Sequence, residues 1–380
     1  QLTIRYANGS NDNRKMTLLV NGNSQGTINL NSTGSWGTWK EKTLNLNGLR
    51  DGNNVIRLQA ANPKSGPNID RLEFNALGAD SAVQNPVENN RPAASPRPAP
   101  ANAESQAMSI GEYGSSELDH NWKTITLDKR YINPVVIVSD PTTNGGDPAV
   151  VRLRRVTGRT FQMRLQEPNY KDVRHTKESV SYMVMESGDW TLADGTRISA
   201  GTRQTNRLTS RGFDSVSLNG FDQTPTVLSQ VQTFNNTDWV TTRTKNQSKS
   251  QFKLAMQEEE ALNGGSHAQE TVGWFAVEVG GDYEGDSILQ GGQTERSYDD
   301  SWGTVNFDQA FAQAPSIIAK LGSHYGSDTA SLRLDDITSQ SFGVRVSEEQ
   351  SLDRELVHTN ESISFLALQG QSGSLQGMSV

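Results

Sequence analysis

Apolar and polar side chains alternate over short stretches of this chain, beginning in residues 1–77. Alternation runs through residues 2–6 and 16–20, and the second stretch ends at Asn21-Gly22, a pair that favours a tight hairpin turn. Further alternation occurs at Leu44 and Leu46, at Ile56 and Leu58, and at Ile69, Leu72 and Phe74. Because a period of two is typical of strands that bury one face, this region is predicted to be an all-β module.

Three later stretches alternate most cleanly and predict half-buried antiparallel strands. Their apolar positions are Phe161, Met163 and Leu165; Phe252, Leu254 and Met256; and Phe342, Val344 and Val346. A stretch that is apolar on both faces follows each of them, at residues 180–185, 272–277 and 363–368. Such a strand is predicted to lie centrally in its sheet, since an exposed apolar edge favours aggregation.

Polar residues recur at fixed positions relative to these strands. They show that a unit of roughly ninety residues is repeated three times in tandem. In the first copy Pro134 is followed by Asp147 and Arg152, and the motif His-x-x-Glu begins at His175. The second and third copies keep the same residues in the same order. The full recurring polar set is Asp147, Arg152, Glu167, His175 and Glu178; Asp238, Arg243, Glu258, His267 and Glu270; and Asp328, Arg333, Glu348, His358 and Glu361.

The predicted fold is therefore all-β. It comprises a partial jelly-roll β-sandwich (1–77), a Pro/Ala/Asn linker (78–107), three tandem six-stranded antiparallel β-sandwich repeats (108–202, 203–283 and 284–370) and a flexible tail (371–380). Three covalently joined copies would form a pseudo-trimer in which one chain replaces three subunits.

Composition narrows the range of partners. Hydrophobic residues make up 33% of the chain, a share that suits thin sandwiches. The net charge of −8 argues against nucleic acid as a partner, and no apolar run approaches the roughly 20 residues that would insert in a membrane. There is no cysteine, so no disulfide framework exists. The acidic run at residues 258–260 is expected to be a solvated loop or strand end.

Four motifs in the first 77 residues carry a family resemblance: Arg5-Tyr6-Ala7-Asn8-Gly9-Ser10, Val20-Asn21-Gly22, Gly34-Ser35-Trp36-Gly37-Thr38-Trp39 and Gly66-Pro67-Asn68-Ile69-Asp70. In this order and spacing, the region resembles the C-terminal half of carbohydrate-binding modules of families 6 and 35. The resemblance implies that Trp39 stacks on a sugar ring and that Asn68 hydrogen-bonds its hydroxyls. A pyranose offers an apolar face to an aromatic ring and hydroxyls to an amide. Trp36 is either a further sugar contact or a core residue.

The same resemblance has a consequence for the start of the chain. The first half of such a module, which supplies an opposing aromatic and part of a structural calcium site, has no counterpart here, so its strands are expected upstream of Gln1 or from another chain. Asp70 is either a surviving calcium ligand or an aspartate that caps a turn.

Residues 108–370 carry a second resemblance. An aromatic-led strand, an aromatic before proline, a loop with aspartate, then phenylalanine and a closing aromatic strand occur in this order, which resembles H-type lectins. Those are six-stranded sandwiches that form trimers and bind N-acetylgalactosamine-type sugars near subunit boundaries. The region is also similar to repeats appended to secreted bacterial polysaccharide-degrading enzymes. The motifs that carry this second likeness are Asn133-Pro-Val-Val-Ile-Val-Ser-Asp-Pro-Thr, His175-Thr-Lys-Glu-Ser-Val-Ser-Tyr and Glu270-Thr-Val-Gly-Trp-Phe-Ala-Val-Glu.

The recurring polar set admits three interpretations. It could form a sugar site in each copy, with carboxylates accepting from hydroxyls and the arginine donating to them. It could instead be a structural network, in which the arginine pairs with a glutamate on an adjacent strand and the histidine holds a loop by bonding backbone. His175, His267 and His358 could also surround a threefold axis and bind a metal. We favour the structural network because every copy keeps the set.

No motif indicates catalysis. The chain lacks Gly-x-Ser-x-Gly, a phosphate loop and His-Glu-x-x-His, and it offers no single asymmetric carboxylate pair of the kind that a glycosidase needs. We predict a non-catalytic carbohydrate-binding, adhesive region of a secreted bacterial protein that acts on polysaccharide. One alternative is a structural protein that self-associates in an extracellular complex or filament. Another is an accessory part of an enzyme whose catalytic domain precedes Gln1.

Overall fold

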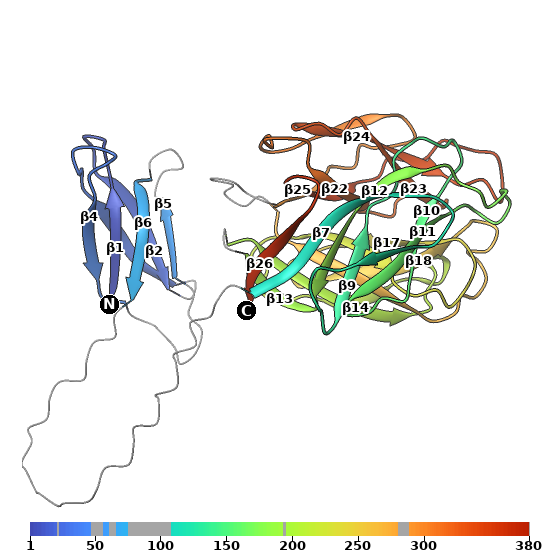
Figure 1. Cartoon of the computed structure of the whole chain (residues 1–380), viewed down its shortest axis with the longest axis horizontal. Coiled ribbons are helices and arrows are strands. Elements are labelled where there is room, and N and C mark those ends of the chain that lie inside the picture. Colours follow the sequence, from blue (N-terminus) through green and yellow to red (C-terminus); the bar gives the residue numbers. More distant parts are fainter. Residues whose placement is uncertain are drawn as a thin grey trace, which may run out of the picture. The chain divides into compact units, whose positions relative to one another are not determined.

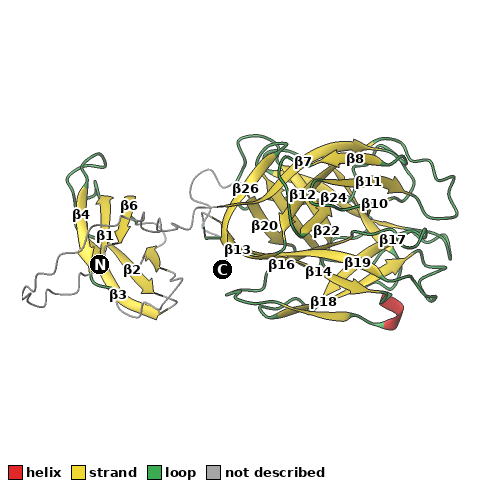
Figure 2. Cartoon of the chain, turned by 60° about the horizontal axis from the view of Figure 1, so that its bottom comes forward, coloured by secondary structure: helices red, strands yellow, loops and turns green. Residues whose placement is uncertain are grey.

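The structure is a computed structural model, and it describes residues 1–20, 23–46, 56–60, 66–74, 108–192, 195–279 and 289–379. The predicted linker, the Asn21-Gly22 turn and the side chain of Asp70 lie outside these residues. The chain divides into two compact units, residues 1–100 (unit 1) and 101–380 (unit 2). Regular structure is almost entirely strand, with one helical turn, η1 (Thr209–Arg211), in the part that is described (Figure 2). None of the described helical structure is long and apolar enough to span a bilayer.

The described part of unit 1 forms two three-stranded antiparallel sheets. Its strands are β1 (Leu2–Ala7), β2 (Arg14–Val20), β3 (Asn23–Leu30), β4 (Lys40–Leu44), β5 (Ile56–Ala60) and β6 (Asn68–Phe74). The sheets have the orders β4-β1-β6 (Figure 1) and β3-β2-β5. Alternate residues such as Ile4, Tyr6, Met16 and Leu18 share one buried core, so the alternation places one face of each sheet inward as predicted.

Unit 2 repeats a six-strand pattern three times. The first copy contains β7 (Met108–Leu118), β8 (Lys123–Thr126), β9 (Pro134–Val138), β10 (Val150–Arg154), β11 (Thr160–Gln166) and β12 (Glu178–Glu186). The second contains β14 (Arg197–Thr205), β15 (Asp214–Ser217), β16 (Thr226–Val231), β17 (Val240–Lys245), β18 (Gln251–Glu258) and β19 (Glu270–Val277). The third contains β20 (Leu289–Gln293), β21 (Gly303–Asn306), β22 (Ser316–Leu321), β23 (Ala330–Asp335), β24 (Ser341–Glu348) and β25 (Ile363–Leu368).

Each copy is a sandwich of two antiparallel sheets. The outer sheets are β8-β11-β10, β15-β18-β17 and β21-β24-β23. The strands predicted from clean alternation lie at the centre of these sheets, and in β11 Phe161, Met163 and Leu165 are buried while Gln162 and Arg164 are partly exposed. The strands predicted to be apolar on both faces, β12, β19 and β25, are central in the inner groups β7-β12-β9, β14-β19-β16 and β20-β25-β22. Both predictions are confirmed.

The three inner groups share one hydrophobic core. Met183 in β12, Phe275 in β19 and Leu366 in β25 are fully buried in the same cluster. The next residue of each strand points the other way and packs inside its own sandwich. The two apolar faces of these strands are explained by this arrangement, because each strand lies between its own sandwich and the shared core.

The C-terminal residues correct the predicted boundaries. In the predicted flexible tail, residues 373–379 form a strand: β26 (Gly373–Ser379) pairs with β7 and with β13 (Gly188–Leu192). Figure 1 shows β26 beside β7. These strands join the first and second inner groups into one eight-stranded sheet. Leu375 is fully buried in the shared core, so pairing and burial override a composition rich in glycine and serine. The second copy also begins earlier than predicted, because β14 starts at Arg197.

Candidate functional site

Three buried arginines join the repeats in a closed ring. Arg152 in β10 of the first repeat donates to backbone carbonyls in the loop 233–238 of the second. Arg243 in β17 of the second repeat forms an ion pair with Glu361 of the third. Arg333 in β23 of the third repeat donates to backbone carbonyls in the corresponding loop of the first. The order of contacts is that of a cyclic trimer with head-to-tail interfaces, which agrees with the predicted pseudo-trimer.

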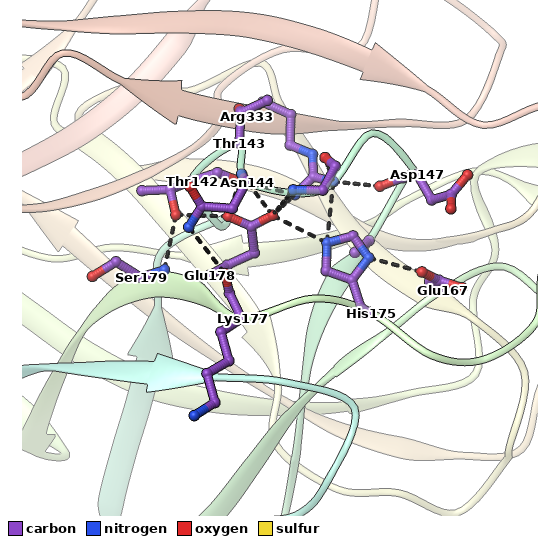
Figure 3. Close-up of polar contacts among 12 residues, drawn as sticks. Thr142, Thr143, Asn144, Asp147, Glu167, His175, Lys177, Glu178, Ser179 and Arg333 are labelled. Carbon is purple, nitrogen blue, oxygen red and sulfur yellow. Dashed lines mark hydrogen bonds and ion pairs between the residues drawn. The ribbon is translucent and has the colours of Figure 1, made fainter.

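Glu178 connects this ring to the His-x-x-Glu motif (Figure 3). Its carboxylate accepts hydrogen bonds from the Thr142 hydroxyl (2.8 Å) and from the backbone N–H groups of Asn144 (2.8 Å) and Gly145 (2.7 Å). Arg333 Nη1 approaches the same carboxylate to 3.8 Å. One glutamate therefore holds a loop of its own repeat and receives the arginine of another.

His175 bridges two carboxylates of the first repeat. Nδ1 lies 2.8 Å from Glu167 and Nε2 lies 3.2 Å from Glu178. Burial opposes ionisation of Glu178, but hydrogen bonds from His175 and from two backbone amides outweigh it and lower its pKa. Burial raises the pKa of Glu167. The Arg333 guanidinium supplies a buried positive charge 3.8 Å from Glu178.

The other two copies have the same residues, but the distances from the histidine to its two glutamates differ. In the second, His267 Nδ1 hydrogen-bonds Glu258 and Nε2 lies 3.5 Å from Glu270. Burial lowers the pKa of His267. The two glutamates raise this pKa by more than burial lowers it, so the net shift is upward. In the third, His358 lies 3.6 Å from Glu348 and 3.5 Å from the glutamate of its own motif. Neither ring nitrogen of His358 has a hydrogen-bond partner among the described residues.

The arginines, histidines and glutamates of the recurring set turn inward, and each exposes 4% or less of its surface. A sugar in solution cannot reach them, and their polar atoms serve the junctions between repeats. Two details differ from the structural network we expected. The arginine bonds another repeat instead of a glutamate on an adjacent strand, and Glu178 rather than His175 holds the loop backbone. Nor do the three histidines converge: among the described residues, no group that could hold a metal contains more than one.

The recurring aspartates lie at the rim of the junctions, and each has a different neighbour. Asp147 pairs with Lys171 at 2.6 Å. Asp238 accepts from the side-chain amide of Asn169 at 3.3 Å. Asp328 instead lies in a cluster of carboxylates at the junction of the second and third repeats.

That cluster contains Glu260, Asp328 and Glu348, each of which places one oxygen within 4.8 Å of the others. Burial and the negative charge of Asp328 and Glu260 raise the pKa of Glu348 to about 8. Burial and the charge of Glu349 raise the pKa of Glu260 to about 7. The expectation that residues 258–260 form a solvated run is wrong, because the first two expose only 1% and 4% of their surface. Sequence reasoning missed Glu260 because it does not recur.

An aromatic position at the junctions was also missed. Trp122 of the first repeat packs edge-on against Phe234 of the second at 5.3 Å, and Phe213 of the second packs against His324 of the third at 5.2 Å. Trp302 occupies the same position in the third repeat and is 47% exposed. The matching loop residue of the first repeat is a threonine, which offers no ring. Aligning the copies on β8, β15 and β21 reveals this position.

In unit 1, the predicted sugar contacts Trp39 and Asn68 flank the end of β1. Asn68 in β6 lies opposite Ala7, and Trp39 immediately precedes Lys40, which lies opposite Tyr6 from the other side. The Arg5 guanidinium stands 5.3 Å from the Trp39 ring. Arg5 and Ala7 alternate with the core residues of β1, so Trp39 and Asn68 lie along the outer face of the sheet. Asn68 is exposed and Trp39 is partly exposed.

Trp36 is supported from beneath by the turn that follows β1. A Cβ at Gly9 would lie 2.5 Å from Cδ1 of Trp36, so only glycine lets the ring approach this closely. Arg14 stands 5.1 Å from the ring, and Trp36 is 44% exposed. Trp36 is therefore a surface residue and not part of the core. The described residues give no test of Asp70 as a calcium ligand.

The chain matches no protein-family model and no solved structure. It is 30% identical over 257 residues to halomucin of Haloquadratum walsbyi, a match that covers 65% of this chain and 3% of that protein. It is 47% identical over 73 residues to endo-1,4-beta-xylanase B of Cellvibrio japonicus, covering 19% of this chain and 12% of the xylanase. It is 36% identical over 72 residues to exo-beta-D-glucosaminidase of Amycolatopsis orientalis, covering 19% and 7%.

The chain thus spans no more than 12% of the length of these relatives. A match over 65% of the chain necessarily includes part of the triple repeat, so the halomucin likeness extends into unit 2. The two short matches are to segments of enzymes named for carbohydrate substrates. Part of this chain is therefore similar to a segment found in carbohydrate-active proteins.

Proposed function

We propose that this chain is a non-catalytic carbohydrate-binding region of a secreted bacterial protein that acts on or adheres to polysaccharide. The observation that carries the proposal is the outer face of β4-β1-β6, where Trp39 and Asn68 lie on either side of β1. The short matches to a xylanase and a glucosaminidase support a saccharide as the ligand.

The chemistry of this face suits an oligosaccharide. Trp39 presents an aromatic surface for the C–H face of one sugar ring, and Asn68 both donates to and accepts from hydroxyls. They are two strand spacings apart, about 10 Å, so a ligand that contacts both must be longer than one sugar. Arg71 and Glu41 form an ion pair at 3.2 Å on the same sheet, and each is about half exposed, so further polar contacts border the aromatic surface.

Trp302 provides a second candidate surface, in unit 2. It is 47% exposed, and the Arg345 guanidinium stands 5.1 Å from its ring. At the other two junctions an aromatic ring of the following repeat covers the equivalent residue. A sugar ring could stack on Trp302 where that cover is missing.

The test is binding of the whole chain to insoluble xylan, chitosan and cellulose, followed by calorimetric titration with oligosaccharides of the retained polymer. We expect weak binding, with Trp39→Ala lowering the affinity at least about tenfold, which corresponds to 1.4 kcal/mol. Trp39→Phe keeps an aromatic face and should retain most of the affinity.

Trp302→Ala tests the second candidate surface in the same experiment. If Trp302→Ala abolishes binding while Trp39→Ala does not, the saccharide site lies in unit 2. Retained binding in both single variants and in the double variant would contradict both surfaces. No retention on any polymer would remove carbohydrate binding as the function tested.

A further inference from the structure

The junction between the second and third repeats differs from the other two by one carboxylate. Glu260 follows β18 in the second repeat, and the equivalent residues of the first and third repeats are the amides Asn169 and Gln350. The aspartate at each junction also differs, since Asp147 has Lys171 as an ion-pair partner. Among the described residues, no lysine or arginine forms an ion pair with Asp328.

Two repeats contribute to the resulting cluster. Asp328 lies just before β23 and Glu348 ends β24, both in the third repeat, while Glu260 reaches across from the second. The backbone N–H of Thr329 donates to Glu260 Oε1 at 3.1 Å and holds that side chain over the junction. The Thr329 hydroxyl donates to the backbone carbonyl of Glu258 at 2.6 Å, which fixes the two loops to one another. Glu260 is therefore held across the junction by a hydrogen bond from the backbone of the third repeat.

The side chain of Glu348 gives independent support for a ligand at this cluster. It is 97% buried, because only 3% of its surface is exposed, yet its Oε2 has no hydrogen-bond partner among the described residues. Oε2 of its counterpart Glu167 is also without a partner among the described residues, but Glu167 hydrogen-bonds His175 at 2.8 Å, whereas Glu348 stands 3.6 Å from His358. A buried carboxylate oxygen without a donor is costly, and here it belongs to a group that contributes to the cluster.

We propose that Glu260, Asp328 and Glu348 bind a calcium ion that joins the second and third repeats. Two oxygens that bind one calcium ion at 2.3–2.6 Å cannot lie farther apart than about 5 Å, and these three lie within 4.8 Å of one another. The ligands are all oxygens, which favours a hard cation over zinc or copper. Calcium suits the site better than magnesium, because it accepts irregular geometry and can complete its shell with backbone carbonyls and water.

Calcium would act here as a clamp on one junction of the ring. Its charge offsets three carboxylates that otherwise repel one another across the boundary between two repeats. The other junctions have neutral amides at the position of Glu260. The site lies in unit 2, far in sequence from Asp70, and is independent of the carbohydrate-binding surfaces proposed above.

The test uses the whole chain after treatment with a chelator, titrated with calcium chloride in a calorimeter and unfolded by heat with and without calcium. A structural site of this type is expected to have a dissociation constant of about 10⁻⁴ M. Free calcium at a hundred times that constant should raise the unfolding midpoint of unit 2 by about 5 °C. Glu260→Gln and Asp328→Asn should each remove this binding event and this shift.

Glu260→Gln is the informative variant because the amides of the other two junctions show that the fold accepts a neutral group there. It should also raise the midpoint of the calcium-free protein, since it removes a repulsive charge. The matched control is Asp238→Asn, which changes the equivalent aspartate of the second repeat and should leave the calcium shift intact. An unaltered shift in Glu260→Gln, loss of the shift in Asp238→Asn alone, or no calcium response in the native chain would overturn the proposal.

Discussion

The first and third repeats have one histidine and two glutamates at the same positions of the repeat, but the distances between these side chains differ. In the first, His175 lies between Glu167 and Glu178 at 2.8 and 3.2 Å. In the third, His358 lies 3.6 and 3.5 Å from the equivalent glutamates, and neither of its ring nitrogens is hydrogen-bonded among the described residues. Recurrence of a motif therefore does not guarantee recurrence of its bonds.

The difference separates two kinds of position. Residues that every copy shares build the junctions, because a cyclic arrangement needs the same contacts three times. Positions at which one copy departs are where that copy can hold something more. Glu260 stands where the other copies have an amide, and among the described residues no aromatic ring covers the exposed Trp302 as one covers its counterparts.

The largest expected effect comes from the arginine that reaches the first repeat. Arg333→Met removes hydrogen bonds to the carbonyls of Thr142 (3.0 Å) and Gly145 (3.3 Å) and leaves Glu178 without its buried cation. We expect a loss of about 3–5 kcal/mol in the free energy of unfolding, measured by urea denaturation. Arg243→Met should cost less, because Nε and Nη1 of Arg243 have no hydrogen-bond partner in the described structure. Equal losses would contradict this ranking.

Acid should lower the stability of the protein by protonating Glu361. Burial alone would raise its pKa, but His358, Arg243 and the Ser323 hydroxyl outweigh burial and lower it to about 2. A depressed carboxyl pKa gives stability that is complete above the unfolded value of about 4.3 and is lost as the pH falls towards 2. The loss is at most about 3 kcal/mol. Urea denaturation between pH 6 and pH 2 checks it.

Glu361→Gln should reduce the loss of unfolding free energy between pH 6 and pH 2. The control is Glu41→Gln in unit 1, because the side chain of Glu41 is 51% exposed. This variant should leave the pH dependence of the unfolding free energy unchanged. An equally steep loss of stability in Glu361→Gln would show that another group carries the acid sensitivity.

Substitution of the two histidines tests the comparison directly. His175→Gln removes two bonds to buried carboxylates and should cost about 2 kcal/mol. His358→Gln removes contacts longer than hydrogen bonds and should cost less than about 1 kcal/mol. Thermal unfolding of both variants in the same calcium-free buffer gives the difference. A larger loss for His358→Gln would mean that the two repeats are held alike.

Much of the fold could be predicted from alternation because strand faces are local. The buried face of β11 and the central position of β12 can both be predicted from the pattern of apolar residues within each strand. The C-terminal strand β26 was not predicted, because residues 371–379 offer only Leu375 and Met378 as apolar side chains among glycine, serine and glutamine. Its partner β7 begins at Met108, and such distant pairing leaves no local signal.

The junctions show the same limit. The sequence marks Arg152, Arg243 and Arg333 as a recurring set, and the structure buries all three. It does not say that each crosses to another repeat, since the partner depends on how the copies close into a ring. In the N-terminal sandwich, Trp39 and Asn68 were predicted together from a resemblance, and strand register places them on either side of β1.

The smallest expected effect concerns the aromatic position of the first and third repeats. Trp122 packs on Phe234 and lies 4.0 Å from the Arg154 guanidinium, so Trp122→Ala should cost about 1–2 kcal/mol through lost aromatic and cation–π contacts. No aromatic ring in the described part of the chain covers Trp302, and Trp302→Ala should change the free energy of unfolding by less than about 0.5 kcal/mol. Urea denaturation of both variants measures this contrast. A cost for Trp302→Ala as large as that for Trp122→Ala would mean that Trp302 supports its junction. A near-neutral result leaves its ring available to a ligand, because a side chain that is 47% exposed and adds little stability has no structural use for that surface.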